Sequence, residues 1–146
     1  MDKWVLRNRI RNYEGIITEN KEKIYVLKSK LEKIDGEKSK LADMQDEISD
    51  NYIAKRNKID AYMAIARGRA IQSILTRGFE MYSSTNCDTQ INRLENIIFL
   101  INENISKIKE MIAEMEWENN RYFSAIKDCE WQIAEIERKE REKENV

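Results

Sequence analysis

The chain has 146 residues, of which 36% are charged, with four glycines and neither proline nor histidine. The 26 basic and 27 acidic side chains give a net charge of −1, which marks neither nucleic acid nor a membrane as a partner. A compact enzyme needs many turns, usually built with Pro or Gly, and the commonest general base and zinc ligand is histidine. The composition therefore disfavours an enzyme and indicates a few long helices.

The first predicted element is a long helical arm over residues 2–66. Its apolar residues recur with a period of 3.5, which keeps one seam of a helix against a partner helix. Asn20 and Lys38 occupy seam positions, where polar side chains cost stability but fix register. Asp35-Gly36 is turn chemistry, yet the heptad phase is unchanged across it, so we expect the helix to continue. The seam runs Ile10, Tyr13, Ile17, Asn20, Ile24, Leu27, Leu31, Ile34, Lys38, Leu41.

The middle of the chain is rich in small residues and has a blurred heptad. We predict a pivot at Gly68 and a short helix over residues 69–82, which lets two long arms of similar length pair. The most turn-like cluster follows at residues 83–88, because Ser, Thr, Asn and Asp compete for backbone hydrogen bonds. We therefore predict the main reversal of chain direction there, with Asp88 or Thr89 capping the next helix.

The last predicted element is a second long arm over residues 89–142. Its seam is almost entirely apolar, with Asn119 as the one interruption. The seam runs Ile91, Leu94, Ile98, Ile101, Ile105, Ile108, Ile112, Met115, Asn119, Tyr122, Ile126, Cys129, Ile133, Ile136. Together the patterns predict an all-α protein with one elongated helical domain over 1–146. Its expected architecture is a long antiparallel coiled-coil hairpin with a short additional helix near the centre of the chain.

Cysteine usage and hydropathy predict a protein made in the cytosol. If one helix joins Cys87 and Cys129, they stand about 60 Å apart, far beyond the reach of a disulfide. Cys129 is most simply a small core residue. The longest strongly apolar run, Ile97–Ile101, is too short to span a membrane, and no signal peptide is visible. Export without a cleavable peptide is left open.

We expect no catalytic residues, no metal ligands and no bound cofactor, because no known constellation of such residues is present. The informative side chains are aromatic residues off the seam. Trp117 and Trp131 fall opposite the buried seam, with Phe99 and Phe123 at flanking positions. Large aromatic side chains on a solvated face often mark an interaction surface. The alternative is that the first arm or the short helix covers them as a third layer.

Charge is unevenly distributed along the chain. Residues 55–77 contain six basic side chains against Asp60 alone, and residues 110–146 contain eleven acidic and six basic ones. The plainest interpretation is a set of solvated helix faces. A nucleic-acid-associated or inhibitor protein is a further alternative, and it predicts salt-sensitive binding that weakens when Arg67 and Arg69 are replaced.

Three features follow one another along the chain: Ile24-x-x-Leu27-x-x-x-Leu31 with Gln45 and Glu47, then Ala66-Arg67-Gly68 with Phe79, then Met115-Glu116-x-Glu118, Tyr122, Ile126 and Trp131-x-Ile133. In this order they resemble the small LXG-associated α-helical proteins (the Lap group, YwqH-like members) of Gram-positive bacteria. These in turn are similar to the WXG or Esx hairpins of type VII secretion. The resemblance departs from the family at Ala66, which stands where WxG has tryptophan. A Tyr-x-x-x-Asp/Glu export signal is also missing, and Phe99…Glu103 and Trp131…Glu135 are the nearest matches.

The resemblance implies a non-enzymatic targeting chaperone that binds the helical N-terminal region of an LXG-type toxin for type VII secretion. It also implies a WxG-like pivot at Ala66, Arg67 and Gly68. The expected partner is a helical toxin domain, a second small helical protein, or both. The alternative function is a generic cytoplasmic coiled-coil adaptor or structural homo-oligomer, and a homodimer is left open.

Overall fold

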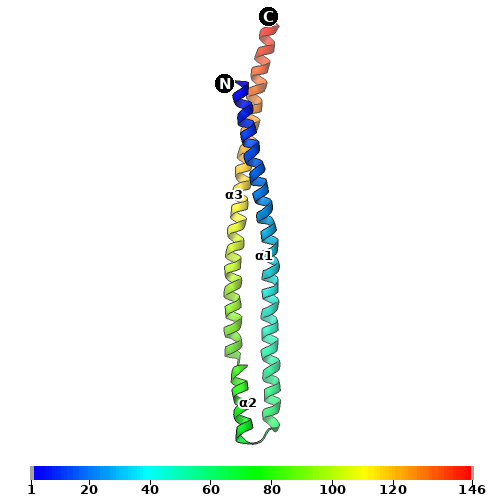
Figure 1. Ribbon diagram of the computed structural model, residues 1–146, viewed down its shortest axis with the longest axis vertical. Helices are drawn as coiled ribbons and strands as arrows, with labels where there is room; N and C mark the ends of the chain where they lie inside the picture. The colour runs from blue at the N-terminus through cyan, green and yellow to red at the C-terminus, as the bar shows by residue number, and fades with distance from the viewer. Residues whose placement is uncertain (1, 146) are drawn as a thin grey trace. The chain divides into compact units, whose positions relative to one another are not determined.

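The computed structural model describes residues 2–145, and every regular element in that range is an α-helix (Figure 1). Helix α1 spans Lys3–Ile65, α2 spans Arg69–Met81 and α3 spans Ser84–Glu144. The all-α prediction is therefore confirmed. Helix α1 also passes through Asp35-Gly36 without a break, as the unchanged heptad phase predicts. Within residues 2–145, none of the helices has the sustained hydropathy of a membrane-spanning segment.

The helices group into two compact units, where the sequence alone predicts one domain over 1–146. Unit 1 comprises Met1–Glu32 and Ser106–Val146, and unit 2 comprises Lys33–Ile105, so α1 and α3 each contribute to both. Most of the buried residues belong to unit 1. Among the described residues of unit 2, only Cys87 and Ile105 are buried. The half-buried Lys38 on the seam of unit 2 is consistent with looser packing there.

Unit 1 is an antiparallel pair formed by the first part of α1 and the last part of α3. Near the start of α1, the Lys3 ammonium lies 2.9 Å from a carboxylate oxygen of Glu140. Further along α1, Lys28 lies 3.5 Å from Glu116. The partner number falls as the α1 number rises, which defines the antiparallel direction. The core consists of heptad residues: Leu6, Ile17 and Ile24 from α1, with Ile112, Ile126 and Cys129 from α3.

Two asparagines lie inside this core. Asn20 donates a hydrogen bond from Nδ2 to Oδ1 of Asn119 at 2.9 Å, and both residues are buried. Asn119 in turn donates from its own Nδ2 to the Ile17 carbonyl oxygen at 3.5 Å. The polar seam positions predicted on separate arms are therefore partners. Burying the two amides together satisfies groups that would each be costly to bury alone.

In unit 2 the chain reverses at residues 66–68, between α1 and α2 (Figure 1). Gln72 donates from Nε2 to the Ala66 carbonyl oxygen at 2.8 Å, which ties the start of α2 to the end of α1. Tyr82 then meets Tyr52 edge-on, with ring centroids 5.6 Å apart. Helix α2 therefore runs back along α1, and the prediction that the main reversal lies at 83–88 was wrong.

The cluster predicted as a turn at 83–88 begins α3 instead. Ser83 is the last residue before α3 begins, and its Oγ accepts a hydrogen bond from the Asn86 backbone N–H at 3.3 Å. Asn86 also donates from Nδ2 to the carbonyl oxygens of Glu80 and Met81, at the end of α2. The cap is therefore Ser83, rather than Asp88 or Thr89, and the break between α2 and α3 is short. Cys87 lies in the first turn of α3, where it is buried, and both cysteines are free.

Two glycines in helix-rich surroundings are expected to respond oppositely to alanine. Gly68 has φ 100° and ψ 145°, a conformation that costs a residue with a Cβ roughly 1–3 kcal/mol. A Cβ at the helical Gly36 would meet nothing within 4 Å. We expect Gly68→Ala to lower the free energy of unfolding by that amount and Gly36→Ala to raise it by roughly 0.5–1 kcal/mol. Urea denaturation measures both, and stabilisation by Gly68→Ala would contradict the positive φ.

Candidate partner-binding surface

The two tryptophans predicted at the interface lie on the outer face of α3 in unit 1. Trp117, Ser124 and Trp131 follow one another at seven-residue steps, so they lie on one side of the helix. Fourteen residues of helix separate the two indoles by roughly 21 Å along the axis. Trp117 is 63% exposed and Trp131 is 67% exposed. The small Ser124 between them leaves room for another helix to approach closely.

Two aromatic side chains of this region carry a cation over the ring. The Arg121 guanidinium carbon lies 5.0 Å from the Trp117 ring centroid. The Lys21 ammonium, from α1, lies 5.5 Å from the Phe123 ring centroid. Exposed cation–π contacts contribute about 0.5–1 kcal/mol. They hold the rings in defined positions while the remaining ring surface stays open to solvent.

The structure separates the four aromatic residues predicted as interface. Phe123, Trp117 and Trp131 belong to unit 1, whereas Phe99 is an exposed residue of unit 2. Within the described residues, the structure leaves the tryptophans open rather than covered by a third helical layer. Their role as an interface stays a prediction. The predicted WxG-like pivot, Ala66 to Gly68, forms the connection between α1 and α2 in unit 2.

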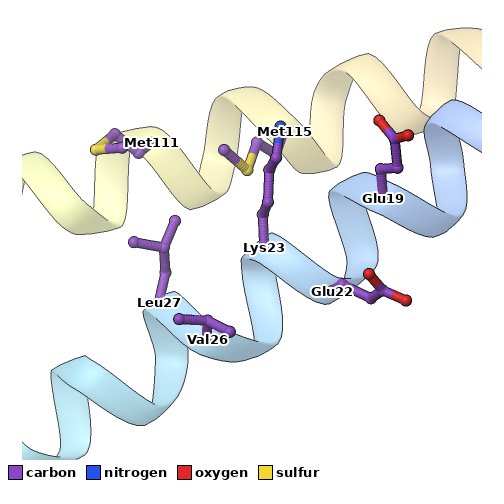
Figure 2. Close-up of a pocket in the computed structure, with 7 residues that line it drawn as sticks. All are labelled: Glu19, Glu22, Lys23, Val26, Leu27, Met111 and Met115. Atoms are coloured by element: carbon purple, nitrogen blue, oxygen red, sulfur yellow. The ribbon is translucent and has the colours of Figure 1, made fainter.

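An open apolar groove runs between α1 and α3 in unit 1. Figure 2 shows Leu27 and Lys23 projecting from α1 toward Met111 and Met115 of α3. Val26 contributes a further apolar side chain, and the groove has a volume of about 460 Å³. Methionine is flexible and polarisable, and for that reason it is common on surfaces that adapt to a partner. The remaining lining residues are Glu19 and Glu22.

Sequence reasoning missed this groove because it followed only the seam. Leu27 and Met115 are seam residues, whereas Met111 flanks the seam of α3 and Val26 lies further round α1, toward its outer side. An apolar residue next to a seam widens the apolar stripe beyond what a two-helix contact needs. That signal was present in the sequence at Met111, although the proximity of Met111 to Val26 depends on how the helices pair.

The electrostatics around this surface are those of exposed side chains. Arg138 donates a hydrogen bond to Glu135, which holds the pKa of Glu135 below its ordinary value and raises the pKa of Arg138. Glu137 and Glu140, near the end of α3, pair with Arg7 and Lys3 of α1. Within residues 2–145, no group of three or more His, Cys, Asp or Glu side chains is placed to hold a metal ion.

Comparison of the chain with protein-family models, with curated proteins and with solved structures gives no match.

Proposed function

We propose that the protein is a non-enzymatic targeting chaperone that binds the helical N-terminal region of an LXG-type toxin for type VII secretion. The observation that carries the proposal is the pair of exposed tryptophans on the outer face of α3. Indole side chains are enriched among the residues that dominate binding energy at interfaces. The toxin class comes from the family resemblance, and the helical form of the partner comes from the spacing of the anchors.

A partner helix of four or more turns would lie along the line from Trp117 through Ser124 to Trp131. Helix-in-groove recognition uses apolar anchors repeated along one face, and a partner with its own heptads supplies them at the same interval. Arg121 and Lys127 flank this line, together with one acidic residue, Asp128. Acidic residues beside the apolar positions of the partner would therefore set its direction.

The proposal includes the long antiparallel coiled-coil hairpin expected from the heptads. Its support is that α1 and α3 are each unbroken helices, that α1 and α3 pair antiparallel in unit 1, and that α2 runs back along α1 in unit 2. A rigid hairpin presents the tryptophan face with little loss of entropy on binding, which is the benefit of preorganisation.

Replacing Trp117 and Trp131 with alanine is expected to weaken binding of the helical toxin region by a factor of about thirty or more. Each indole buried at an interface is worth about 2 kcal/mol, which corresponds to roughly thirtyfold. The test is a calorimetric titration of the chain with the purified N-terminal region of an LXG protein encoded beside it. Circular dichroism of the double variant should be unchanged, because both side chains are exposed.

The matched control is Tyr25→Ala, which removes an exposed aromatic side chain from α1. It is expected to leave the affinity unchanged. If the double variant binds the toxin region as tightly as the parent chain, the tryptophan face is not the binding site. If no LXG protein encoded beside this chain binds the parent chain, the assignment to type VII secretion is wrong. The tryptophan face would then bind a different class of partner.

The groove at Val26, Leu27, Met111 and Met115 favours a second candidate function, a coiled-coil adaptor or structural homo-oligomer. A second copy of the chain could place apolar residues in this groove and complete a larger bundle. Sedimentation equilibrium separates the candidates. A stable homodimer that is lost in Met111→Glu, with no binding of a toxin region, supports the second candidate over the first.

A further inference from the structure

A second surface lies in unit 2, where α1 passes into α2. Lys58, Tyr62 and Ile65 recur at four- and three-residue steps, so they share one face of α1. Ile74, Arg77 and Met81 recur at three- and four-residue steps and share one face of α2. Together these six residues are called the basic-apolar face below. Each set combines apolar side chains with one basic side chain.

The contacts between α1 and α2 place both sets on the same side of the helix pair. Each residue of the face immediately precedes a half-buried residue. These are Ile59 and Met63 in α1 and Ala66 directly after it, with Leu75 and Gly78 in α2 and Tyr82 directly after it. A Cβ on Gly78 would lie 3.3 Å from Ile59 Cδ1, which confirms that these residues face each other. Two antiparallel helices are related by a twofold axis perpendicular to both. Residues that lie one position before a contact residue are therefore on the same side of the pair in both helices.

The apolar members of the face stand out from the surface. Ile65 is 75% exposed, Ile74 67%, Met81 65% and Tyr62 58%. Protruding aliphatic side chains need a complementary pocket in a protein partner. They need none in a lipid bilayer, which yields to their shape.

The charge around the face is positive. Lys58 and Arg77 lie within it, and Arg67 and Arg69 flank Gly68 at the turn. Asp60 is two positions from both Lys58 and Tyr62, so helical geometry places it away from the face. Glu80 lies three positions after Arg77, at the edge of the face, and is one acidic side chain against Lys58, Arg67, Arg69 and Arg77. Basic residues near a membrane are attracted by the negative surface potential of anionic lipids.

We propose that the basic-apolar face docks on an anionic lipid surface. Ile65, Ile74 and Met81 insert shallowly at the level of the headgroups, and Lys58 and Arg77 pair with lipid phosphates and carboxylates. Tyr62 lies at the boundary, since its ring is apolar and its hydroxyl can remain hydrated. The docking is peripheral, and it uses a different surface from the tryptophan face of unit 1.

The test is flotation of the full chain with vesicles of phosphatidylcholine alone and of phosphatidylcholine with phosphatidylserine. We expect binding to the mixed vesicles that weakens as salt is raised, and much weaker binding to the zwitterionic ones. Lys58→Gln with Arg77→Gln should reduce partitioning about fivefold for each charge removed. Ile65→Ser with Ile74→Ser should reduce it tenfold or more, with unchanged circular dichroism.

Matched controls remove the same side-chain types elsewhere in unit 2. Lys33→Gln with Lys40→Gln, and Ile97→Ser with Leu100→Ser, change exposed residues and should retain vesicle binding. Trp117→Ala with Trp131→Ala should retain it as well. The proposal is overturned if the controls lose binding as strongly as the face variants, or if the parent chain binds neither vesicle. It is also overturned if the face variants abolish only self-association or only binding to single-stranded nucleic acid.

Discussion

Replacing Ile112 with aspartate is expected to unfold unit 1. Ile112 is 7% exposed on the seam of α3, so its side chain is removed from water by the packing of α1. The variant loses apolar burial worth about 1.5–3 kcal/mol and gains a carboxylate in an apolar contact. The combined loss exceeds about 3 kcal/mol, a large part of the roughly 5–15 kcal/mol that stabilises a typical domain.

Far-UV circular dichroism during urea denaturation measures this loss. The matched control is Ala113→Asp, which places the same carboxylate one residue further along, at an exposed position. It is expected to cost only about 0.5 kcal/mol, from helix propensity. Lowering the pH should recover part of the stability of Ile112→Asp, because a neutral carboxyl group costs less to bury than a charged one. Equal destabilisation by the two variants would show that the seam is not the core of unit 1.

The long helices were predictable because the heptad signal is local and repeated. Each turn of α1 and α3 contributes another apolar residue to the same stripe, so one polar position such as Lys38 does not erase the pattern. Gly36 illustrates the same point. Its local turn preference is worth less than the apolar contacts of the turns on either side, and the helix continues through it.

The connections were harder to predict, because the same residue types favour turns and helix caps. Ser83 and Asn86 were interpreted as part of a loop, yet they cap α3 and satisfy carbonyl groups at the end of α2. Only the positive φ of Gly68 distinguishes the true reversal. A sequence shows that glycine permits this conformation but does not show that the chain adopts it.

Only part of the candidate surface, the exposed tryptophans, was predictable from the sequence, whereas the groove was not. The exposure of Trp117 and Trp131 follows from heptad position alone, since both stand opposite the seam. The groove at Val26 and Met111 depends on which turns of α1 and α3 face each other. That pairing is set by contacts between residues far apart in the chain, which a pattern within one helix cannot supply.

Replacing either Asn20 or Asn119 with leucine is expected to lower the free energy of unfolding by about 1–3 kcal/mol. Each single variant leaves one buried amide without the partner that it has in the parent chain. Leucine at both positions removes both amides and fills the space with apolar groups of similar size. The double variant should therefore recover most of the loss, and its stability can exceed that of the parent chain.

The double variant should also lose the specificity of the pairing. Equivalent seam positions on a helix are seven residues apart. A slip of α1 along α3 by one heptad would therefore move Asn20 from the level of Asn119 to the level of Ile112 or Ile126. Such a slip buries an unpaired amide in the parent chain but costs little when both positions are leucine. Urea denaturation of all four variants gives the coupling energy, and sedimentation equilibrium detects the additional oligomers that a slipped register allows. A coupling energy near zero, with the parent and double variants equally monodisperse, would show that the asparagine pair does not set the register.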